Sequence, residues 1–213
     1  KRFPMSYEAG AWQFPMNALE RASAGNSRLL MLCNPFNPIG RTLTQTELEA
    51  IVDISVQNDL VICSDEIHCD LVLDGRPHIP IASISEAAAE RTITLMAPSK
   101  TFNLAGLGGS FAIIQNPALR EQFEAPRAGL VGNVNLLGYT AMHAAYADCE
   151  EWRQELLRYL EGNRDYLSNA IENIPGIHMS PQESTYLAWL NDAELGLNDP
   201  PDFFEQKGLG MSP

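Results

Sequence analysis

TLTQTELEAIVDISVQND, residues 42–59, has the pattern of a helix between two strands. Thr44 and Glu47 are spaced as a capping box, in which each side chain satisfies a backbone N–H of the first helical turn. Short apolar runs at residues 29–33 and 60–63 flank this segment. The segment therefore predicts a βαβ unit. Its buried face is predicted from the helical spacing of Leu48, Ile51, Val52 and Ser55.

The chain contains four such apolar runs, each nearly continuous rather than alternating. They cover residues 29–33, 60–63, 92–96 and 111–114. Strands that are covered by helices on both faces have this pattern. Residues 81–91 form an Ala-rich helical candidate, and Asn116 with Pro117 resembles the N-cap and first residue of another helix. We therefore expect an α/β fold with a mostly parallel sheet and flanking helices.

The pattern changes after Asp148, where a long amphipathic stretch runs to Pro175 and Gly176. STYLAWL, residues 184–190, then predicts a strand, and PPDFFEQKG, residues 200–208, predicts a further helix. We expect residues 1–165 to form a large domain and residues 166–213 to begin a smaller α+β domain. The chain does not start with Met and stops at GLGMSP, so we expect it to be truncated at both ends.

The overall composition limits the partners and the compartment. The 27 acidic residues exceed the 14 Lys and Arg residues, and the net charge of −13 gives no electrostatic support for nucleic acid or an anionic membrane. No apolar run reaches the length of a bilayer span, and KRFPMSYEAG at the N-terminus lacks the apolar stretch of a signal peptide. A cytoplasmic protein with reduced cysteines is therefore expected.

Polar side chains follow three of the predicted strands. Asn34 comes after the first run, Asp65 after the second, and Ser99 with Lys100 after the third. In an open parallel sheet, ligands bind beyond the carboxyl ends of the strands. Although an isolated lysine is more often solvated, and NPFNPIG alone could be a simple turn, the shared sheet edge favours a functional site.

An amine, a carboxylate and an amide at one sheet edge fit the chemistry of pyridoxal phosphate. A partly desolvated lysine such as Lys100 can form a Schiff base with an aldehyde. The cofactor also needs a carboxylate for its ring nitrogen and donors for its phenolic oxygen, which Asp65, Asn34 and His68 would supply. A metal site in DEIHCD is not expected because no second ligand cluster accompanies it.

Four ordered motifs, NPFNPIGR, SDEIHCDL, APSKTFNLAGL and STYLAWL, resemble those of fold-type I pyridoxal-phosphate enzymes. The closest resemblance is to MalY/PatB-type cystathionine β-lyases, which are relatives of the class I/II aminotransferases. The resemblance implies that Lys100 carries the cofactor and moves the substrate α-proton. It also implies that Asp65 binds the ring nitrogen, that Asn34 and His68 contact the phenolic oxygen, and that Ser99 helps to hold the phosphate.

The sequence departs from the wider aminotransferase pattern at two phosphate-binding positions. Ala97 stands where a Ser is often found, and Gly108 stands where an Arg is often found. The resemblance implies a carbon–sulfur β-lyase that acts on sulfur amino acids by β-elimination, in a homodimer. A class I/II aminotransferase or a catalytically incompetent remnant of the fold are the alternatives.

Other aromatic and histidine residues are assigned no role in this site. His78, His143 and His178 are isolated in the sequence and are expected to be structural or solvated. The three large aromatic residues Tyr139, Tyr146 and Trp152 are predicted to pack in the core.

Overall fold

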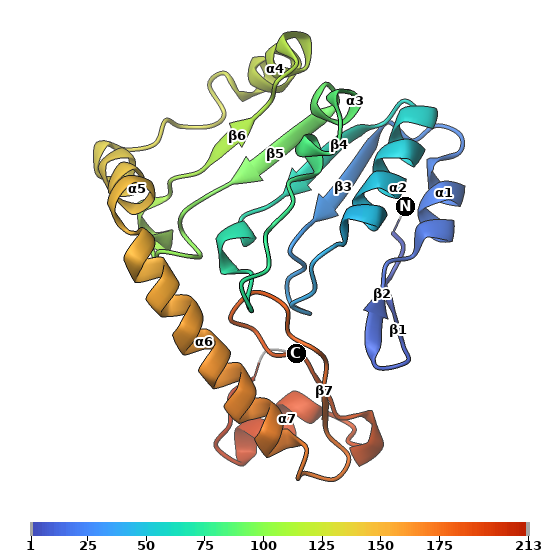
Figure 1. Ribbon diagram of the computed structural model, residues 1–213, viewed down its shortest axis with the longest axis vertical. Coiled ribbons are helices and arrows are strands. Elements are labelled where there is room, and N and C mark those ends of the chain that lie inside the picture. The colour runs from blue at the N-terminus through green and yellow to red at the C-terminus, as the bar shows by residue number, and fades with distance from the viewer. Residues whose placement is uncertain (1, 212–213) are drawn as a thin grey trace.

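A computed structural model describes residues 2–211, and Figure 1 shows a central sheet with helices packed around it. The sheet has four strands in the order β3, β4, β5, β6, of which only the last pairs in the antiparallel direction. The predicted α/β class with a mostly parallel sheet is therefore confirmed. The strands are β3 (Leu29–Cys33), β4 (Val61–Asp65), β5 (Thr92–Met96) and β6 (Phe111–Ile113).

Three helices cover one face of this sheet: α1 (Met16–Ser23), α2 (Gln45–Gln57) and α3 (Glu86–Ala89). Their apolar side chains join those of the strands in one buried cluster, the larger of two in the described residues, and burial of such side chains stabilises the fold. The cluster includes Leu19, Leu30, Leu32, Leu48, Ile51, Val52, Ile62 and Ala88.

The second face of β3 lacks the helical cover that was predicted. Leu29 is 52% exposed and Met31 is 77% exposed, whereas the alternating Leu30 and Leu32 are buried. The reason is that α1, α2 and α3 share one buried cluster on a single face. Within residues 2–211, the continuous apolar run at residues 29–33 therefore has helices on one side only.

The helix signals near α2 and α4 (Pro117–Glu124) are confirmed. Thr44 Oγ1 accepts from the Glu47 N–H at 3.3 Å, and Glu47 Oε2 accepts from the Thr44 N–H at 2.9 Å. Asn116 caps α4 by accepting from the N–H groups of Ala118 and Leu119. The helix expected at residues 81–91 is instead divided into a 3₁₀ turn, Ile81–Ser83, and the four-residue α3.

The long amphipathic stretch forms α6 (Glu150–Ile171), which runs from α5 (Leu136–Asp148) past the sheet to the C-terminal part (Figure 1). The boundary predicted between residues 165 and 166 lies inside this helix, and the domain division remains a prediction. Within residues 2–211, no helix combines the length and apolar character needed to cross a membrane. The remaining elements are β1 (Ser6–Glu8), β2 (Ala11–Gln13), β7 (His178–Met179), β8 (Leu190–Asn191), α7 (Pro200–Gln206) and the 3₁₀ turns Cys69–Leu71, Ala105–Leu107, Ala125–Arg127 and Ala193–Leu195.

The strand predicted at residues 184–190 was wrong for most of its length. Only Leu190 belongs to a strand, β8, while Ser184 forms a single bridge with Val72. Thr185 adopts a left-handed backbone with φ +66°, which no regular strand contains. This segment hydrogen-bonds to loops at the sheet edge instead of to a neighbouring strand.

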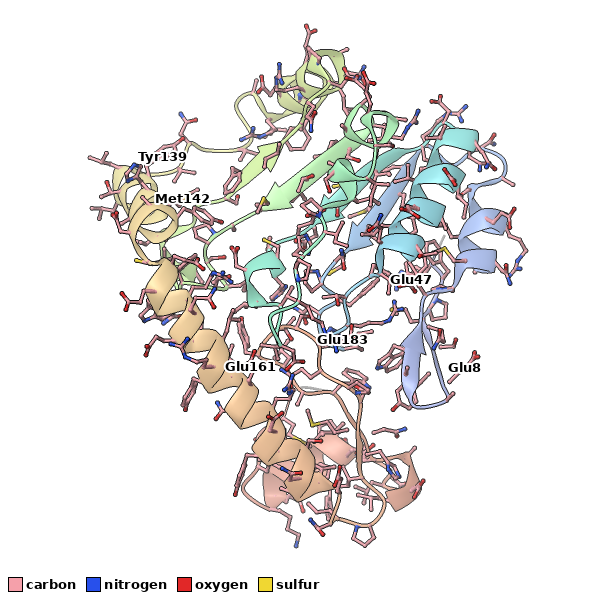
Figure 2. All side chains as sticks on the ribbon, in the orientation of Figure 1. Glu8, Glu47, Tyr139, Met142, Glu161 and Glu183 are labelled. Carbon is pink, nitrogen blue, oxygen red and sulfur yellow. The ribbon has the colours of Figure 1, made fainter. Side chains whose placement is uncertain are left out.

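These contacts join the C-terminal part to the carboxyl ends of β3 and β4. The N–H groups of Glu183 and Ser184 both donate to the Gly40 carbonyl, at 2.8 and 2.9 Å. Glu183 also accepts from the N–H and hydroxyl of Thr42 and forms a 3.1 Å ion pair with Arg76. Figure 2 shows Glu183 at the junction between the sheet and the C-terminal part.

The prediction of core packing was wrong for Tyr139, which is 57% exposed. Tyr146 and Trp152 are also partly exposed, although each contacts the Phe102 ring, at centroid distances of 5.8 and 5.9 Å. These aromatic residues lie on α5 and α6, where apolar sequence alone does not distinguish a core position from an open surface. Figure 2 shows Tyr139 on the outer side of α5.

Candidate active site

The ends of β3 and β4 lie level with each other. The register pairs Cys33 with Asp65, and Asp65 with Leu95 of β5. The Asn34 N–H donates to the Asp65 carbonyl at 3.0 Å, which extends the ladder by one residue. Asn34 and Asp65 are therefore adjacent at the carboxyl edge of the sheet, where the sequence predicted them.

Asp65 lies on the face of the sheet opposite α1, α2 and α3. Successive side chains of a strand alternate between faces, and Ile62 and Ser64 of β4 occupy the face that these helices cover. One oxygen of Asp65 accepts from the Ile67 N–H at 3.2 Å. Among the described residues, no cation lies within salt-bridge distance of Asp65, so its negative charge is available to a ligand.

The amide of Asn34 is held in one orientation. Asn34 is 1% exposed, and its Oδ1 accepts from the Leu43 N–H at 2.9 Å. Because a backbone N–H can only donate, this bond assigns the oxygen and leaves Nδ2 as the donor. Nδ2 makes no hydrogen bond within residues 2–211, so it can donate to a ligand.

Lys100 lies in a chain of turns that follows β5. This loop is held by bonds from the Phe102 N–H to the Pro98 carbonyl, at 2.8 Å, and from the Leu104 N–H to the Ser99 carbonyl, at 3.1 Å. Lys100 is partly exposed and makes no hydrogen bond or ion pair in the described part of the chain. The amine is therefore not part of a surface ion pair.

His68 lies within electrostatic range of Asp65 and Lys100. Its side chain is buried, and Nε2 is fully enclosed without a hydrogen-bond partner. Burial lowers the pKa of His68; Asp65 opposes this shift, whereas the positive charge of Lys100 adds to it. The lowered pKa of His68 favours its neutral imidazole form.

Two polar residues at this edge were not assigned a role from the sequence. The ring of Tyr186 meets His68 edge-on, at a centroid distance of 6.3 Å and an interplanar angle of 67°. The buried Oγ1 of Thr101, directly after Lys100, has no partner among residues 2–211. The sequence could have indicated Thr101 as a site residue, because it directly follows Lys100. It could not have indicated Tyr186, because the contact of Tyr186 with His68 depends on long-range folding.

The residue directly after β4, Glu66, makes its contacts away from Asp65. Glu66 is 1% exposed, accepts from the Ser64 hydroxyl at 2.8 Å and lies 2.7 Å from His78 Nε2. The two residues line a cavity of about 330 Å³ together with Thr94 and Met96. His78 is therefore paired with a buried carboxyl group, and its structural role stays a prediction.

Ala97 and Gly108, which replace the Ser and Arg often found in aminotransferases, leave few side-chain donors for a phosphate group. Ala97 is buried and offers no side-chain donor, and Gly108 occupies a left-handed position with φ +62°. Ser99 is partly exposed, and its hydroxyl makes no hydrogen bond in the described structure. Of the predicted set, Ser99 is therefore the hydroxyl available for such a group.

Comparisons with known proteins extend over nearly the whole chain. A family model described as aminotransferase class I and II matches residues 2–204. Cystathionine beta-lyase PatB of Bacillus subtilis is 36% identical over 200 residues, which cover 92% of this chain and 51% of that protein. The crystal structure of OvoB has a TM-score of 0.93 at 46% identity and covers 98% of this chain and 55% of that chain.

A further solved structure identifies the cofactor of a relative. Cystalysin from Treponema denticola contains pyridoxal 5'-phosphate and has a TM-score of 0.88 at 36% identity. The match covers 94% of this chain and 52% of that one. The chain spans about half the length of the curated relatives it matches. The resemblance to the PatB-type enzymes is thus confirmed, and the chain belongs to the class I and II aminotransferase family.

Proposed function

We propose that this protein is a pyridoxal-phosphate-dependent carbon–sulfur β-lyase, similar to cystathionine β-lyase, that acts on sulfur amino acids. The observation that carries the proposal is the sheet edge on which Asn34, Asp65 and Lys100 follow three adjacent strands. Similarity to a cystathionine beta-lyase and to cystalysin supports the reaction type.

The residues at this edge fit pyridoxal phosphate. The carboxylate of Asp65 has no cationic partner, and the amine of Lys100 has no acidic one, within residues 2–211. The oriented Nδ2 of Asn34 and the buried, unpartnered Nε2 of His68 add two polar atoms that the described protein leaves unsatisfied. Unpartnered buried polar atoms are costly, so a ligand that pairs with them would be stabilised.

Each side chain then has a defined task. When bound, pyridoxal phosphate supplies an electron-withdrawing ring that stabilises negative charge at the substrate α-carbon. Lys100 Nζ binds the cofactor aldehyde and, once the substrate amine displaces it, removes the α-proton. Asp65 holds positive charge on the ring nitrogen, and Asn34 donates toward the phenolic oxygen.

Two other residues complete the proposed site. His68, in its neutral form, faces the same region and contributes a polar contact without adding charge. Ser99 is proposed to hold the phosphate with its hydroxyl. Loss of the thiolate from the β-carbon would leave aminoacrylate, which water hydrolyses to pyruvate and ammonia.

Aminotransfer is the second candidate, and the family match favours it, because the family takes its name from that reaction. Both reactions start with the removal of the same proton by Lys100. The residues at the sheet edge therefore support both, and the lyase proposal depends on the sequence similarity to PatB.

We also propose that the protein is a cytoplasmic homodimer. A contiguous stretch of the chain, from residue 130 to the start of α5, presents large apolar side chains to solvent. Exposed apolar patches of this kind are typical of protein interfaces. They are Leu130, Val131, Leu136, Leu137 and Tyr139, with exposures of 83%, 57%, 79%, 69% and 57%.

Cofactor attachment can be tested directly because the chain has only the lysines Lys1, Lys100 and Lys207. Pyridoxal phosphate is added, the adduct is reduced with borohydride, and the modified lysine is mapped by mass spectrometry. We expect modification of Lys100 and a visible absorbance band that Lys100→Ala abolishes and Lys207→Ala retains. A band that persists in Lys100→Ala would reject the assignment.

The reaction type requires a separate assay. We expect the holoenzyme to release thiol and pyruvate from cystathionine. Amino transfer that depends on an added keto acid, without release of pyruvate from cystathionine, would assign the protein to the aminotransferases. Absence of both activities, although the cofactor is bound, would indicate a catalytically incompetent remnant.

A further inference from the structure

The orientation of the His68 ring is set by packing rather than by hydrogen bonds. Within residues 2–211, the fully enclosed Nε2 of His68 has no hydrogen-bond partner, and the residue is only 2% exposed. An aromatic contact is made by Tyr186, which meets the imidazole edge-on at 6.3 Å. Edge-to-face pairs prefer one relative orientation, so this contact can hold the ring in place.

Tyr186 directly follows a residue whose backbone conformation costs energy. Thr185 has φ +66°, which is a genuine outlier for a β-branched residue. Such strain persists only where the surroundings over-determine it, and it is concentrated at functional sites.

The surroundings of Thr185 meet this condition. Thr185 is fully buried, and its N–H donates to the Leu71 carbonyl at 2.8 Å. Its carbonyl accepts from Gln182 Nε2 at 3.1 Å, and its hydroxyl accepts from the Leu187 N–H at 3.2 Å. Three hydrogen bonds therefore hold the turn that directs Tyr186 toward the sheet edge.

We propose that Tyr186 is a positioning residue of the active site, whose ring, directed by the left-handed turn at Thr185, fixes the orientation of the His68 imidazole. The proposal deepens the function proposed above and rests on it. Tyr186 belongs to the C-terminal part, whereas His68 follows β4. The contact therefore makes the geometry of the cofactor site depend on the docking of the C-terminal segment.

The contact is first tested in the cofactor-free chain, with variants that separate the ring from its hydroxyl. Tyr186→Phe keeps the ring, Tyr186→Leu keeps apolar volume without a ring, and Tyr186→Ala removes both. Tyr166→Ala is the control because Tyr166 is 78% exposed on α6. Circular dichroism melting establishes which variants fold. If Tyr186→Ala does not fold, Tyr186→Leu is used as the variant without the ring.

The readout is the titration of His68 followed by NMR, with the resonance assigned from its absence in His68→Gln. Burial lowers the pKa of His68, and the charges of Asp65 and Lys100 act on it in opposite directions. Loss of the Tyr186 ring lets water reach the imidazole, so its pKa should rise toward the ordinary value in Tyr186→Ala and Tyr186→Leu. It should stay unchanged in Tyr186→Phe and Tyr166→Ala.

The second readout is the affinity for pyridoxal phosphate, measured from the visible absorbance band. An edge-to-face pair is worth a factor of about three to ten in binding, and we expect that loss in Tyr186→Ala and Tyr186→Leu but not in Tyr186→Phe. An unchanged His68 titration in Tyr186→Leu, or an equal change in Tyr186→Phe, would overturn the positioning role. If the wild-type chain and Lys100→Ala give the same spectrum while His68 still responds to Tyr186, the cofactor proposal fails and the ring contact stands.

Discussion

The Asp65 side chain is expected to act through its charge. Asp65→Asn keeps the size and the hydrogen bond from the Ile67 N–H but removes the negative charge that would hold the ring nitrogen protonated. We expect kcat of the holoenzyme to fall by about 100-fold or more, the scale seen when an electrostatic partner of the reacting group is removed. Steady-state kinetics with cystathionine measure this loss.

The matched control for this substitution is at the other end of the same strand. Asp59 precedes β4, its side chain is 92% exposed, and Asn tolerates its positive φ of 50°. Asp59→Asn should leave kcat unchanged. If Asp65→Asn were as active as Asp59→Asn, the carboxylate would have no part in catalysis.

At the level of single residues, the sequence could predict positions but not all contacts. Asn34 and Asp65 were predicted to share an edge because each directly follows an apolar run, and the register of β3 with β4 places them there. Their roles stay predictions. The contact of Tyr186 with His68 could not be predicted, because it depends on the left-handed conformation of Thr185, which STYLAWL does not signal.

Helix α2 depends on its capping box, and the contribution can be measured. Thr44→Ala removes the side-chain acceptor for the Glu47 N–H, so the free energy of unfolding should fall by about 1 kcal/mol. Urea unfolding measures the change. Thr46→Ala, at an exposed position in the same first turn, should have little effect, and an equal loss in both variants would contradict a capping role.

The ionisation of Glu47 is part of the same box. Burial alone would raise its pKa, but hydrogen bonds from the Thr44 N–H and from Arg41 outweigh burial and lower it. A carboxyl whose pKa is lowered on folding stabilises the protein above its ordinary pKa, and this stabilisation is lost as the pH falls through the lowered value. The Thr44 hydroxyl also donates to Glu47 Oε2 at 3.0 Å, and this bond is stronger to the ionised carboxylate. Because Thr44→Ala removes this bond, its effect should be larger at neutral pH than in acid.

At the level of elements, local sequence patterns predicted helices and strands correctly where interactions between neighbouring residues determine the structure. The strands at residues 29–33 and 92–96 have the predicted limits, and the capping box marks the start of α2. STYLAWL has strand propensity, but its backbone is bonded to the loops around Gly40 and Leu71, so tertiary contacts override that propensity.

For the whole molecule, the junction between the sheet and the C-terminal part depends on Gly40. It has φ +67°, and a Cβ placed there would lie 2.9 Å from the Ser184 carbonyl oxygen. Gly75 has a similar φ of +63° but has open space around it. Gly75→Ala should cost about 1 kcal/mol from backbone strain alone.

Gly40→Ala adds a steric clash to that strain. We expect it to lose roughly 1 to 3 kcal/mol beyond the loss in Gly75→Ala, since the docked segment at residues 182–186 must shift. Urea unfolding gives the difference, and hydrogen exchange at the Thr185 N–H should become faster in Gly40→Ala only. Equal losses of stability in the two variants would show that the close approach to Ser184 contributes nothing.

The apolar surface around the start of α5 makes assembly the second property of the whole molecule that can be tested. If this surface is the dimer interface, a carboxylate placed in it would be buried without a partner, which costs several kcal/mol and would dissociate the dimer. Sedimentation should therefore give a dimer for the wild-type chain and a monomer for Leu137→Glu. Tyr159→Glu on α6, where the native side chain is 67% exposed against 69% for Leu137, should remain dimeric. A wild-type monomer would contradict the proposed dimer. Dissociation of both variants alike would indicate a general effect of charge, because Leu137 and Tyr159 are almost equally exposed.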